Sequence, residues 1–453
     1  MHSTRPSRRL AKTAAAGLVL AAALATTPAG AASLDTDTPD ARSTPDRVLY
    51  WNNAILDAFR KVGGTPGPLT RGGAMMNIAI YDAVNSINTI GKPYLTKDTT
   101  AAGKYGALDS AVDHAAYTAL KNAFPSVDFT TAYNNARALP DRGTPADRQY
   151  GQQLGTKTAQ AIIAHRTGDG STDTTPYTPT TGPGHWIPAP GKPVGAPNWG
   201  NVKPFALTSG SELRPAKPAG FTTPQDMLKS PQYAAQVNEI KAIGGKNSTQ
   251  RTPEQTQIAH YWANDVDGTY KPVGQQYDHT IAIYKKYRPY GQSYDSAKLF
   301  TKMSVSLADA AIAIWDSKFN TDWDLWRPQH AINHADQVPN PDLTADPTWQ
   351  PLEKDTTGNS FSPNFPTYVS GHSGIAAAWA GALKNHFGRD DLTFTAGTDD
   401  PYAKGITRTF TSLTAAAQEK ADSRKYIGVH LDWDNTTALT LGYNVATKTT
   451  TRF

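Results

Sequence analysis

Hydrophobic residues recur at the three- and four-residue spacing of amphipathic helices in several parts of the chain. The first such stretch begins at Asp46, whose carboxylate suits a helix N-cap, and it ends at Gly63-Gly64. The same spacing predicts helices over residues 107–124, 150–170, 231–245, 301–318, 370–388 and 411–430. The alternation of apolar and polar residues that is typical of strands is nearly absent. The pattern therefore predicts an all-α protein.

A segment rich in Pro, Gly and Thr, residues 171–205, separates two helical parts of the chain. Its aromatic residues Trp186, Trp199 and Phe205 predict that it lies against the protein surface and is not a free linker. We therefore expect one helical-bundle body with long Pro- and Gly-rich loops. Its two bundle-like halves would be residues 46–205, which include this connection, and residues 206–453.

The N-terminus has the three parts of a secretory signal: basic "RPSRRLAK", apolar "AAAGLVLAAALATT" and the small-residue cleavage site "AGA". The apolar run is shorter than the roughly 20 residues that span a bilayer. Residues 1–31 are therefore predicted to be a signal peptide, residues 32–45 a flexible N-terminus of the mature chain, and the protein secreted. The pair Arg8-Arg9 also fits the twin-arginine route, so both export routes stay open.

Charge and cysteine content narrow the possible partners. Four of the 44 Lys and Arg residues, and none of the 39 Asp and Glu residues, lie in residues 1–31. The mature chain is therefore close to neutral, which predicts no nucleic-acid partner and no membrane partner. The chain has no cysteine, so thiol chemistry and cysteine metal sites are excluded, and the fold must be stabilised by burial alone.

The stretch "YVSGHSGI", residues 368–375, contains the first candidate site. Ser370 suits an N-cap, and the amides of Gly371 and His372 would be free donors at the positive end of a helix, which favours an anion. His372 is a candidate proton carrier at the same place. A hydrolase elbow, G-x-S-x-G, is incomplete because Ile375 follows Gly374. The alternative is an ordinary capped helix with an incidental histidine.

The stretch "DSRKYIGVHLDWD", residues 422–434, contains the second candidate site. His430 and Asp434 are four residues apart, about 40° around a helix, so the carboxylate can accept the imidazole Nδ1 proton. That leaves Nε2 unprotonated, as a ligand or a nucleophile requires. Arg424 would reach the same place from the same helix, and Gly428 would leave room beside His430. The alternative is an ordinary surface helix with no functional site.

The third stretch, residues 314–332, places Lys318 and Arg327 among three tryptophans. If these cations are buried, they need anionic partners. The alternative is that their charged ends are solvated and only their aliphatic parts pack along the aromatic rings. A continuous helix would put these two on opposite faces, because eight residues separate them. We therefore expect the helix from about Thr301 to end near Lys318, and a turn at residues 320–324 to bring both cations to one cavity.

Together the three stretches resemble the signature of the vanadium-dependent haloperoxidases and the related acid phosphatases of the phosphatidic-acid-phosphatase superfamily. The matching residues are Lys318, Arg327, Pro328, Ser370, Gly371, His372, Ser423, Arg424, Gly428, His430 and Asp434. Six residues usually separate the lysine and the arginine in this family, and a proline often stands where this chain has Val369. "VLYWNNAILDAFR", "AIYDAVNSI" and "ADAAIAIWDSK" are similar to the secreted bacterial haloperoxidases. The resemblance thus covers most of the mature chain.

The resemblance implies a haloperoxidase-like helical fold whose residues 206–453 hold vanadate, with phosphate able to occupy the same site. Ser370 and the Gly371 amide would hydrogen-bond the oxyanion, His430 would be the apical vanadium ligand held by Asp434, and His372 would be the acid–base. The equatorial oxygens would be neutralised by Lys318, Arg327 and Arg424.

The implied activity is that of a peroxidase. Hydrogen peroxide would oxidise a halide to a hypohalous species, which halogenates or oxidises a small organic acceptor. Phe365 stands where the residue type varies with halide range in this family, so chloride and bromide stay open, as does the oligomeric state. The alternative is a secreted acid phosphatase with a phosphohistidine at His430, although length and the N-terminal half favour the peroxidase.

Two further alternatives come from other classes of protein. His330 and His334 are four residues apart, which suits a metal site, but no clear third ligand accompanies them. They would otherwise edge the pocket or cap the helix after Arg327. A secreted binding protein without catalysis is the other alternative, and it would not need the paired His430 and Asp434 or converging cations.

Overall fold

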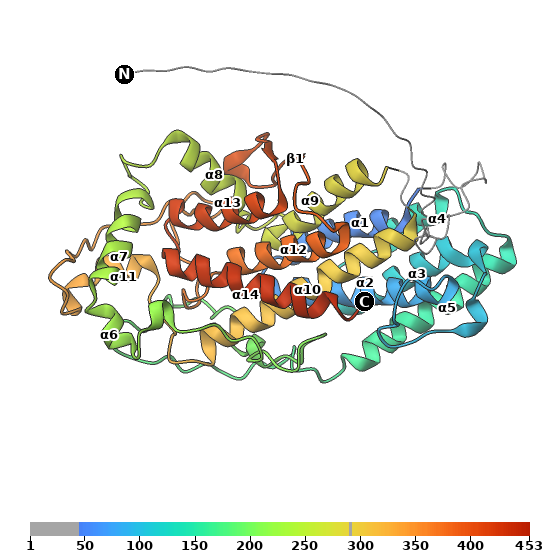
Figure 1. The fold of residues 1–453 in the computed structure, drawn as a ribbon, viewed down its shortest axis with the longest axis horizontal. Coiled ribbons are helices and arrows are strands. Elements are labelled where there is room, and N and C mark those ends of the chain that lie inside the picture. The colour runs from blue at the N-terminus through green and yellow to red at the C-terminus, as the bar shows by residue number, and fades with distance from the viewer. Residues whose placement is uncertain (1–44, 290–291) are drawn as a thin grey trace, which may run out of the picture. The chain divides into compact units, whose positions relative to one another are not determined.

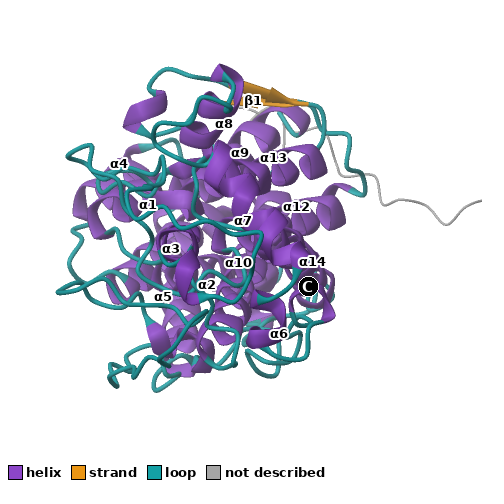
Figure 2. Cartoon of the chain, turned by 90° about the vertical axis from the view of Figure 1, so that its left-hand side faces the viewer, coloured by secondary structure: helices purple, strands orange, loops and turns teal. Residues whose placement is uncertain are grey.

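The computed structural model describes residues 45–289 and 292–453, so the predictions for the signal peptide and for residues 32–44 lie outside the described residues. The described ranges contain fourteen α-helices and one small two-stranded sheet. The helices are α1 Arg47–Val62, α2 Pro66–Ile87, α3 Leu108–Ala123, α4 Thr130–Ala138, α5 Pro145–His165, α6 Pro224–Leu228, α7 Pro231–Ile243, α8 Pro253–Ala263, α9 Lys271–Tyr287, α10 Ser293–Phe319, α11 Pro328–Asn333, α12 Gly371–Phe387, α13 Leu413–Tyr426 and α14 Asp432–Thr450. The strands β1 Phe394–Ala396 and β2 Arg408–Phe410 pair antiparallel at the edge of the helical body (Figure 2). The prediction of an all-α protein is confirmed.

Helix α10 runs through the middle of the body and packs against α2, α12 and α14 (Figure 1). Most of its residues are buried, and alanines and serines let the neighbouring helices approach closely. Buried serine hydroxyls donate to carbonyls one turn earlier, as in Ser306 to Lys302 at 2.8 Å. Helices α3 and α5 pair at one end of the molecule, and α6, α7 and α11 lie at the other (Figure 1).

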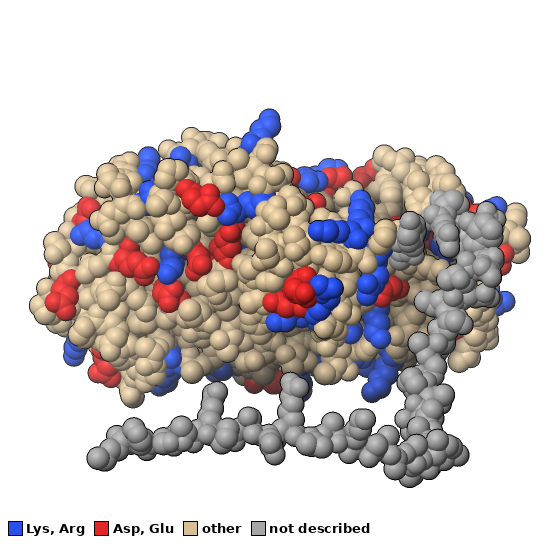
Figure 3. Space-filling model, turned by 45° about the horizontal axis from the view of Figure 1, so that its top comes forward, with Lys and Arg blue, Asp and Glu red and all other residues tan. Residues whose placement is uncertain are grey.

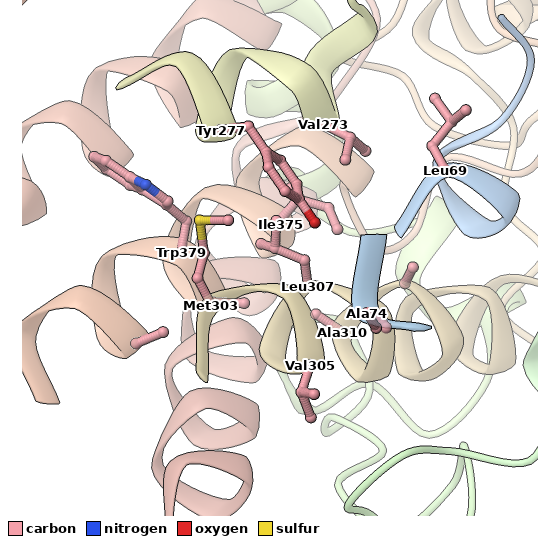
Figure 4. Packing of buried hydrophobic residues seen from close by; sticks show 14 of the residues in the cluster. Leu69, Ala74, Val273, Tyr277, Met303, Val305, Leu307, Ala310, Ile375 and Trp379 are labelled. Carbon is pink, nitrogen blue, oxygen red and sulfur yellow. The ribbon is translucent and has the colours of Figure 1, made fainter. Parts of the chain in front are cut away.

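One hydrophobic cluster extends from α1 to α14. Figure 4 shows part of it, with side chains from three helices: Tyr277 of α9, Met303 and Leu307 of α10, and Ile375 and Trp379 of α12. A second, small cluster of Ala259, Ala263, Leu352, Ile427 and Val429 packs beside the link between α13 and α14. The division of the body at residues 205 and 206 stays a prediction.

The connection over residues 171–205 is held against the body, as its aromatic residues predicted. Trp186, Trp199 and Phe205 are all buried. Asp309 of α10 accepts hydrogen bonds from the backbone amides of Phe205, Ala206 and Leu207 at 2.6, 2.8 and 2.9 Å. Burial raises the pKa of Asp309 to about 6. A buried carboxylate thus fixes the end of this connection to the central helix.

The helix that begins at Asp46 agrees with its prediction. The Asp46 carboxylate accepts from the amides of Val48 and Leu49, and the chain leaves α1 at Gly63 with φ +60°. The periodicity missed α2, α4, α6, α8, α9 and α14. Helix α2 is buried on nearly every side, so it carries no amphipathic stripe. Within the described residues no helix has the length and hydropathy needed to cross a membrane. The face drawn in Figure 3 intersperses acidic and basic side chains.

Candidate functional site

A cavity of about 250 Å³ opens between the start of α12, the side of α10 and the link between α13 and α14. Its lining residues are Gly64, Thr65, Pro66, Gly195, Asp265, Lys271, Pro272, Trp315, Phe361, Pro363, Asn364, Phe365, Gly371, His372, Ile375, Arg424 and His430. Four of the eight predicted site residues, Gly371, His372, Arg424 and His430, therefore face one space. The other four, Lys318, Arg327, Ser370 and Asp434, are buried around it.

The expectation of a single helix through Arg424, His430 and Asp434 is wrong. Helix α13 ends at Tyr426 and α14 begins at Asp432, so His430 lies in the link between them. Gly428 turns the chain there with φ +84°, and a Cβ on it would lie 2.2 Å from the Gly244 carbonyl oxygen. Its glycine is needed for this turn and close approach, and not for room beside His430.

The contacts of His430 fix its protonation. Its Nε2 lies 3.2 Å from Nη1 of Arg327, which can only donate, so Nε2 must be unprotonated. Its Nδ1 lies 3.2 Å from Oδ2 of Asp434 and 3.1 Å from Oγ1 of Thr367, so Nδ1 carries the proton. Burial, together with the nearby Arg327, lowers the pKa of His430 well below its usual value. His430 is therefore a neutral imidazole with its Nε2 lone pair on the cationic side of the site.

Asp434 is the partner that the sequence predicted for His430, although it reaches the imidazole from the first turn of a new helix. Its Oδ2 also accepts from the Leu431 amide at 2.9 Å and from the Thr367 hydroxyl at 2.6 Å. Burial raises the pKa of Asp434 to about 6, against the lowering effect of these hydrogen bonds. The backbone carbonyl of Asp434 accepts from the Ser370 amide at 2.9 Å, which ties α14 to the start of α12.

Helix α10 ends at Phe319, as predicted, and Lys318 and Arg327 meet at one aromatic ring. Lys318 Nζ lies 5.2 Å and Arg327 Cζ 4.7 Å from the centroid of Phe365. Lys318 Nζ donates to the carbonyls of Pro366 and Thr367 at 2.7 and 3.0 Å. Burial and the neighbouring Arg327 lower the pKa of Lys318 well below its usual value. Lys318 thus holds the backbone of residues 366 and 367, which lead to Ser370.

Arg327 is completely buried, and its guanidinium group is only partly paired. Nε donates to the Phe365 carbonyl at 2.8 Å and Nη1 to the Val429 carbonyl at 2.9 Å, whereas Nη2 has no partner within the described residues. Burial lowers the pKa of Arg327 to about 9, which leaves it charged at neutral pH.

Arg424 is 1% exposed, and only one of its three guanidinium nitrogens is paired. Its Nη2 donates to Asp265 Oδ2 and to Glu353 Oε2, both at 3.1 Å. Its Nε and Nη1 have no hydrogen-bond partner in residues 45–289 and 292–453. Asp265 and Glu353 were not predicted, because each lies in a loop outside the three motifs.

Ser370 is the N-cap of α12, as predicted, but it does not line the cavity. Its Oγ accepts from the Ser373 amide and from the Ser373 hydroxyl, and its residue is fully buried. Capping thus uses the acceptor capacity of Ser370 and leaves its hydroxyl proton to donate.

His372, two residues further on, donates from Nε2 to the Ala263 carbonyl at 2.9 Å, and the same nitrogen lies 3.6 Å from Asp265 Oδ2. Burial lowers the pKa of His372 to about 3.

The unpaired donors provide a test of whether an oxyanion fits. Buried N–H groups without an acceptor are rare and costly, at about 1–3 kcal/mol each. Three such groups occur here: Nη2 of Arg327, and Nε and Nη1 of Arg424. Both side chains that carry them are buried cations. A tetrahedral or trigonal oxyanion supplies the acceptors that these donors lack. The residues therefore fit vanadate or phosphate.

The other histidine pair does not form a metal cluster. The rings of His330 and His334 lie 6.2 Å apart and nearly parallel, and burial lowers the pKa of His330 to about 4. No group of three or more His, Asp or Glu side chains with metal-binding geometry occurs in the part of the chain that the structure describes.

Comparisons with known proteins agree with the motifs. Residues 298–453 match the family model of the VCPO second helical-bundle domain. A vanadium chloroperoxidase of Curvularia inaequalis is 28% identical over an alignment that covers 88% of this chain and 80% of the relative. A bacterial vanadium-dependent iodoperoxidase superposes with TM-score 0.70 at 23% identity, covering 90% of this chain and 95% of that one. A holo-type bacterial vanadium-dependent chloroperoxidase gives TM-score 0.69 at 15% identity, covering 91% and 98%.

The fold is therefore that of the vanadium haloperoxidases. The resemblance that the three motifs indicated is confirmed, and it extends over most of the described chain.

Proposed function

We propose that this protein is a vanadate-dependent haloperoxidase, which oxidises a halide with hydrogen peroxide and passes the oxidised halogen to a small organic acceptor. The observation that carries the proposal is the set of unpaired guanidinium N–H groups beside the neutral Nε2 of His430. The names of the relatives reported above favour a peroxidase over the phosphohistidine alternative.

Each predicted residue has a role that its contacts support. Arg424 and Arg327 would hold vanadate by donating to its oxygens, together with the Ser370 hydroxyl and the Gly371 amide. His430 would ligate vanadium through Nε2, and Asp434 would keep the proton on Nδ1. Vanadate, when bound, would supply Lewis-acid activation of hydrogen peroxide. Lys318 would act mainly through its hold on residues 366 and 367.

His372 is the residue proposed to move protons. Because its Nε2 proton is donated to Ala263, the lone pair of the neutral ring is on Nδ1. A bound oxyanion would raise the pKa of this imidazole by adding negative charge beside it, and Asp265 would stabilise the cation. His372 could then accept a proton at Nδ1 and return it.

The deciding experiment uses the mature chain with and without vanadate. We expect peroxide-dependent bromide oxidation only after vanadate loading, and about a thousandfold less of it in His430→Ala, because the proposed vanadium ligand is lost. We also expect weak phosphomonoester hydrolysis by the vanadate-free protein, inhibited by vanadate. Brisk hydrolysis with no halide oxidation by the loaded protein would favour the phosphatase instead.

Secretion is a further part of the proposal. It rests on the basic, apolar and small-residue segments of residues 1–31. We expect the protein in the culture medium to begin after Ala31 by N-terminal sequencing. Recovery of the intact chain inside the cell alone would refute it.

A further inference from the structure

Glu353 is a buried carboxylate that none of the three motifs contains. It lies in the loop between α11 and α12 and is 1% exposed. Its Oε2 accepts from Arg424 Nη2 at 3.1 Å, and the same nitrogen also donates to Asp265 at 3.1 Å. Two carboxylates therefore occupy one corner of the guanidinium, and the Nε and Nη1 donors are left without partners.

The backbone holds Glu353 rigidly against the link that carries His430. Its amide donates to the Ile427 carbonyl at 3.2 Å, and its carbonyl accepts from the Phe361 amide at 3.1 Å. The preceding residue, Leu352, donates to the Gly244 carbonyl at 3.0 Å. A change in the position of Glu353 would therefore change the position of Arg424 relative to His430.

The two carboxylates beside Arg424 differ in their surroundings. Asp265 has a side chain that is 23% exposed, and its pKa is lowered by His372 and Arg424 against the raising effect of burial. Burial and the nearby Asp265 raise the pKa of Glu353 to about 8. The charged groups facing Glu353 are Arg424 and Arg327, which attract its carboxylate, and Asp265 and Asp400, which repel it.

We propose that Glu353 is a positioning residue for the oxyanion, because it holds Arg424 through Nη2 and leaves the Nε and Nη1 donors of this cavity-lining residue free for a ligand. This inference rests on the oxyanion site of the proposed function. The neutral form of Glu353 accepts the Arg424 hydrogen bond and does not repel the bound anion. The ionised form accepts the same hydrogen bond but repels the anion. Oxyanion affinity should therefore fall as the pH rises through about 8.

Three variants test this with the vanadate-free protein, and sulfate is the ligand because its charge does not change between neutral and alkaline pH. Glu353→Gln keeps an acceptor for Arg424 and should bind sulfate within about threefold of the wild type at pH 7. Glu353→Ala removes the acceptor and should bind about tenfold more weakly, as expected for loss of a hydrogen bond to a charged group. Glu239→Gln is the matched control, because it removes the carboxylate partner of Lys425, the residue next to Arg424 on α13. It should leave the sulfate affinity unchanged.

The alkaline arm separates positioning from mere structure. At pH 9.5 the wild type should bind sulfate about tenfold more weakly than at pH 7, because a like charge within several ångströms is unfavourable. Glu353→Gln should lose less affinity than the wild type over this range, because the falling charge of Arg327, whose pKa is about 9, weakens both proteins alike, and it should therefore bind more tightly than the wild type at pH 9.5. Equal affinities of the wild type and Glu353→Gln at both pH values would overturn the inference, even if Glu353→Ala does not fold.

Calorimetry of the wild type distinguishes this failure from failure of the proposed function. Wild-type protein that binds neither sulfate nor phosphate has no oxyanion site, which removes both proposals. Wild-type protein that binds both anions, with Glu353→Ala and Glu353→Gln indistinguishable from it, removes only the role of Glu353.

Discussion

Arg166 and Arg424 are both 1% exposed, yet their surroundings differ in kind. Arg166, just after α5, donates to Asp169 at 2.8 Å and to the carbonyls of Lys203 and Pro204, and its guanidinium lies 4.0 Å from the centroid of Phe205. Arg424 donates from one nitrogen only and leaves Nε and Nη1 unpaired. The donors of Arg166 are all paired within the fold, whereas Arg424 needs a ligand to pair its remaining donors.

The comparison shows that burial of a cation does not by itself identify a site. A fully paired buried arginine is a structural element, since all its donors are satisfied inside the protein. Unpaired donors on a buried cation indicate that something outside the chain supplies the acceptors. In this molecule the criterion leaves Arg166 out and selects Arg327 and Arg424. It also selects Nε of Arg47, but that group lies 4.0 Å from the Asp113 carboxylate and Arg47 does not line the cavity.

The largest effect should come from exchanging each arginine for lysine. Arg424→Lys should lower phosphate affinity by about a hundredfold, because lysine cannot present the same planar set of donors, while the melting temperature changes little. Arg166→Lys should do the reverse, with a melting temperature several degrees lower and phosphate affinity within twofold. Calorimetric titration and thermal unfolding measure both. Equal loss of stability in the two variants would break the comparison.

Asp434→Asn should have the next largest effect. The amide cannot fix the proton on Nδ1 of His430 as the carboxylate does, so halide oxidation should fall by about ten- to a hundredfold. Asp309→Asn is the matched control, since Asp309 is equally buried and binds only backbone amides of the connection. It should lower stability without changing activity per folded molecule. The assay is peroxide-dependent bromide oxidation normalised to folded protein.

The third prediction concerns stabilisation by the anion itself. Phosphate at about a hundred times its dissociation constant should raise the free energy of unfolding by about 2.7 kcal/mol. The increase should persist in Arg166→Lys and fall to about 0.4 kcal/mol in Arg424→Lys at the same phosphate concentration, because its dissociation constant is about a hundredfold higher. Thermal unfolding of the vanadate-free protein with and without phosphate provides the measurement. An equal increase in both variants would show that phosphate acts elsewhere.

The sequence predicted the identities of the site residues better than the local structure that places them. Its motifs marked Arg424, His430 and Asp434, but the spacing of four suggested one helix where the chain instead turns at Gly428. The eight residues between Lys318 and Arg327 predicted a helix end correctly, because a continuous helix would have separated them. Asp265 and Glu353 could not be found, since contacts between distant loops leave no periodic pattern in the sequence.

The hydrogen bond from the Ser370 amide to the Asp434 carbonyl has a consequence for synthesis. A nascent chain leaves the ribosome N-terminus first, so α3 and α5, which pack mainly on each other, can associate during translation. Asp434 belongs to α14, which is translated after every other element of the site. The cations near His430 therefore stay without this aspartate until translation is almost complete, and the anion pocket is the last part of the protein to mature.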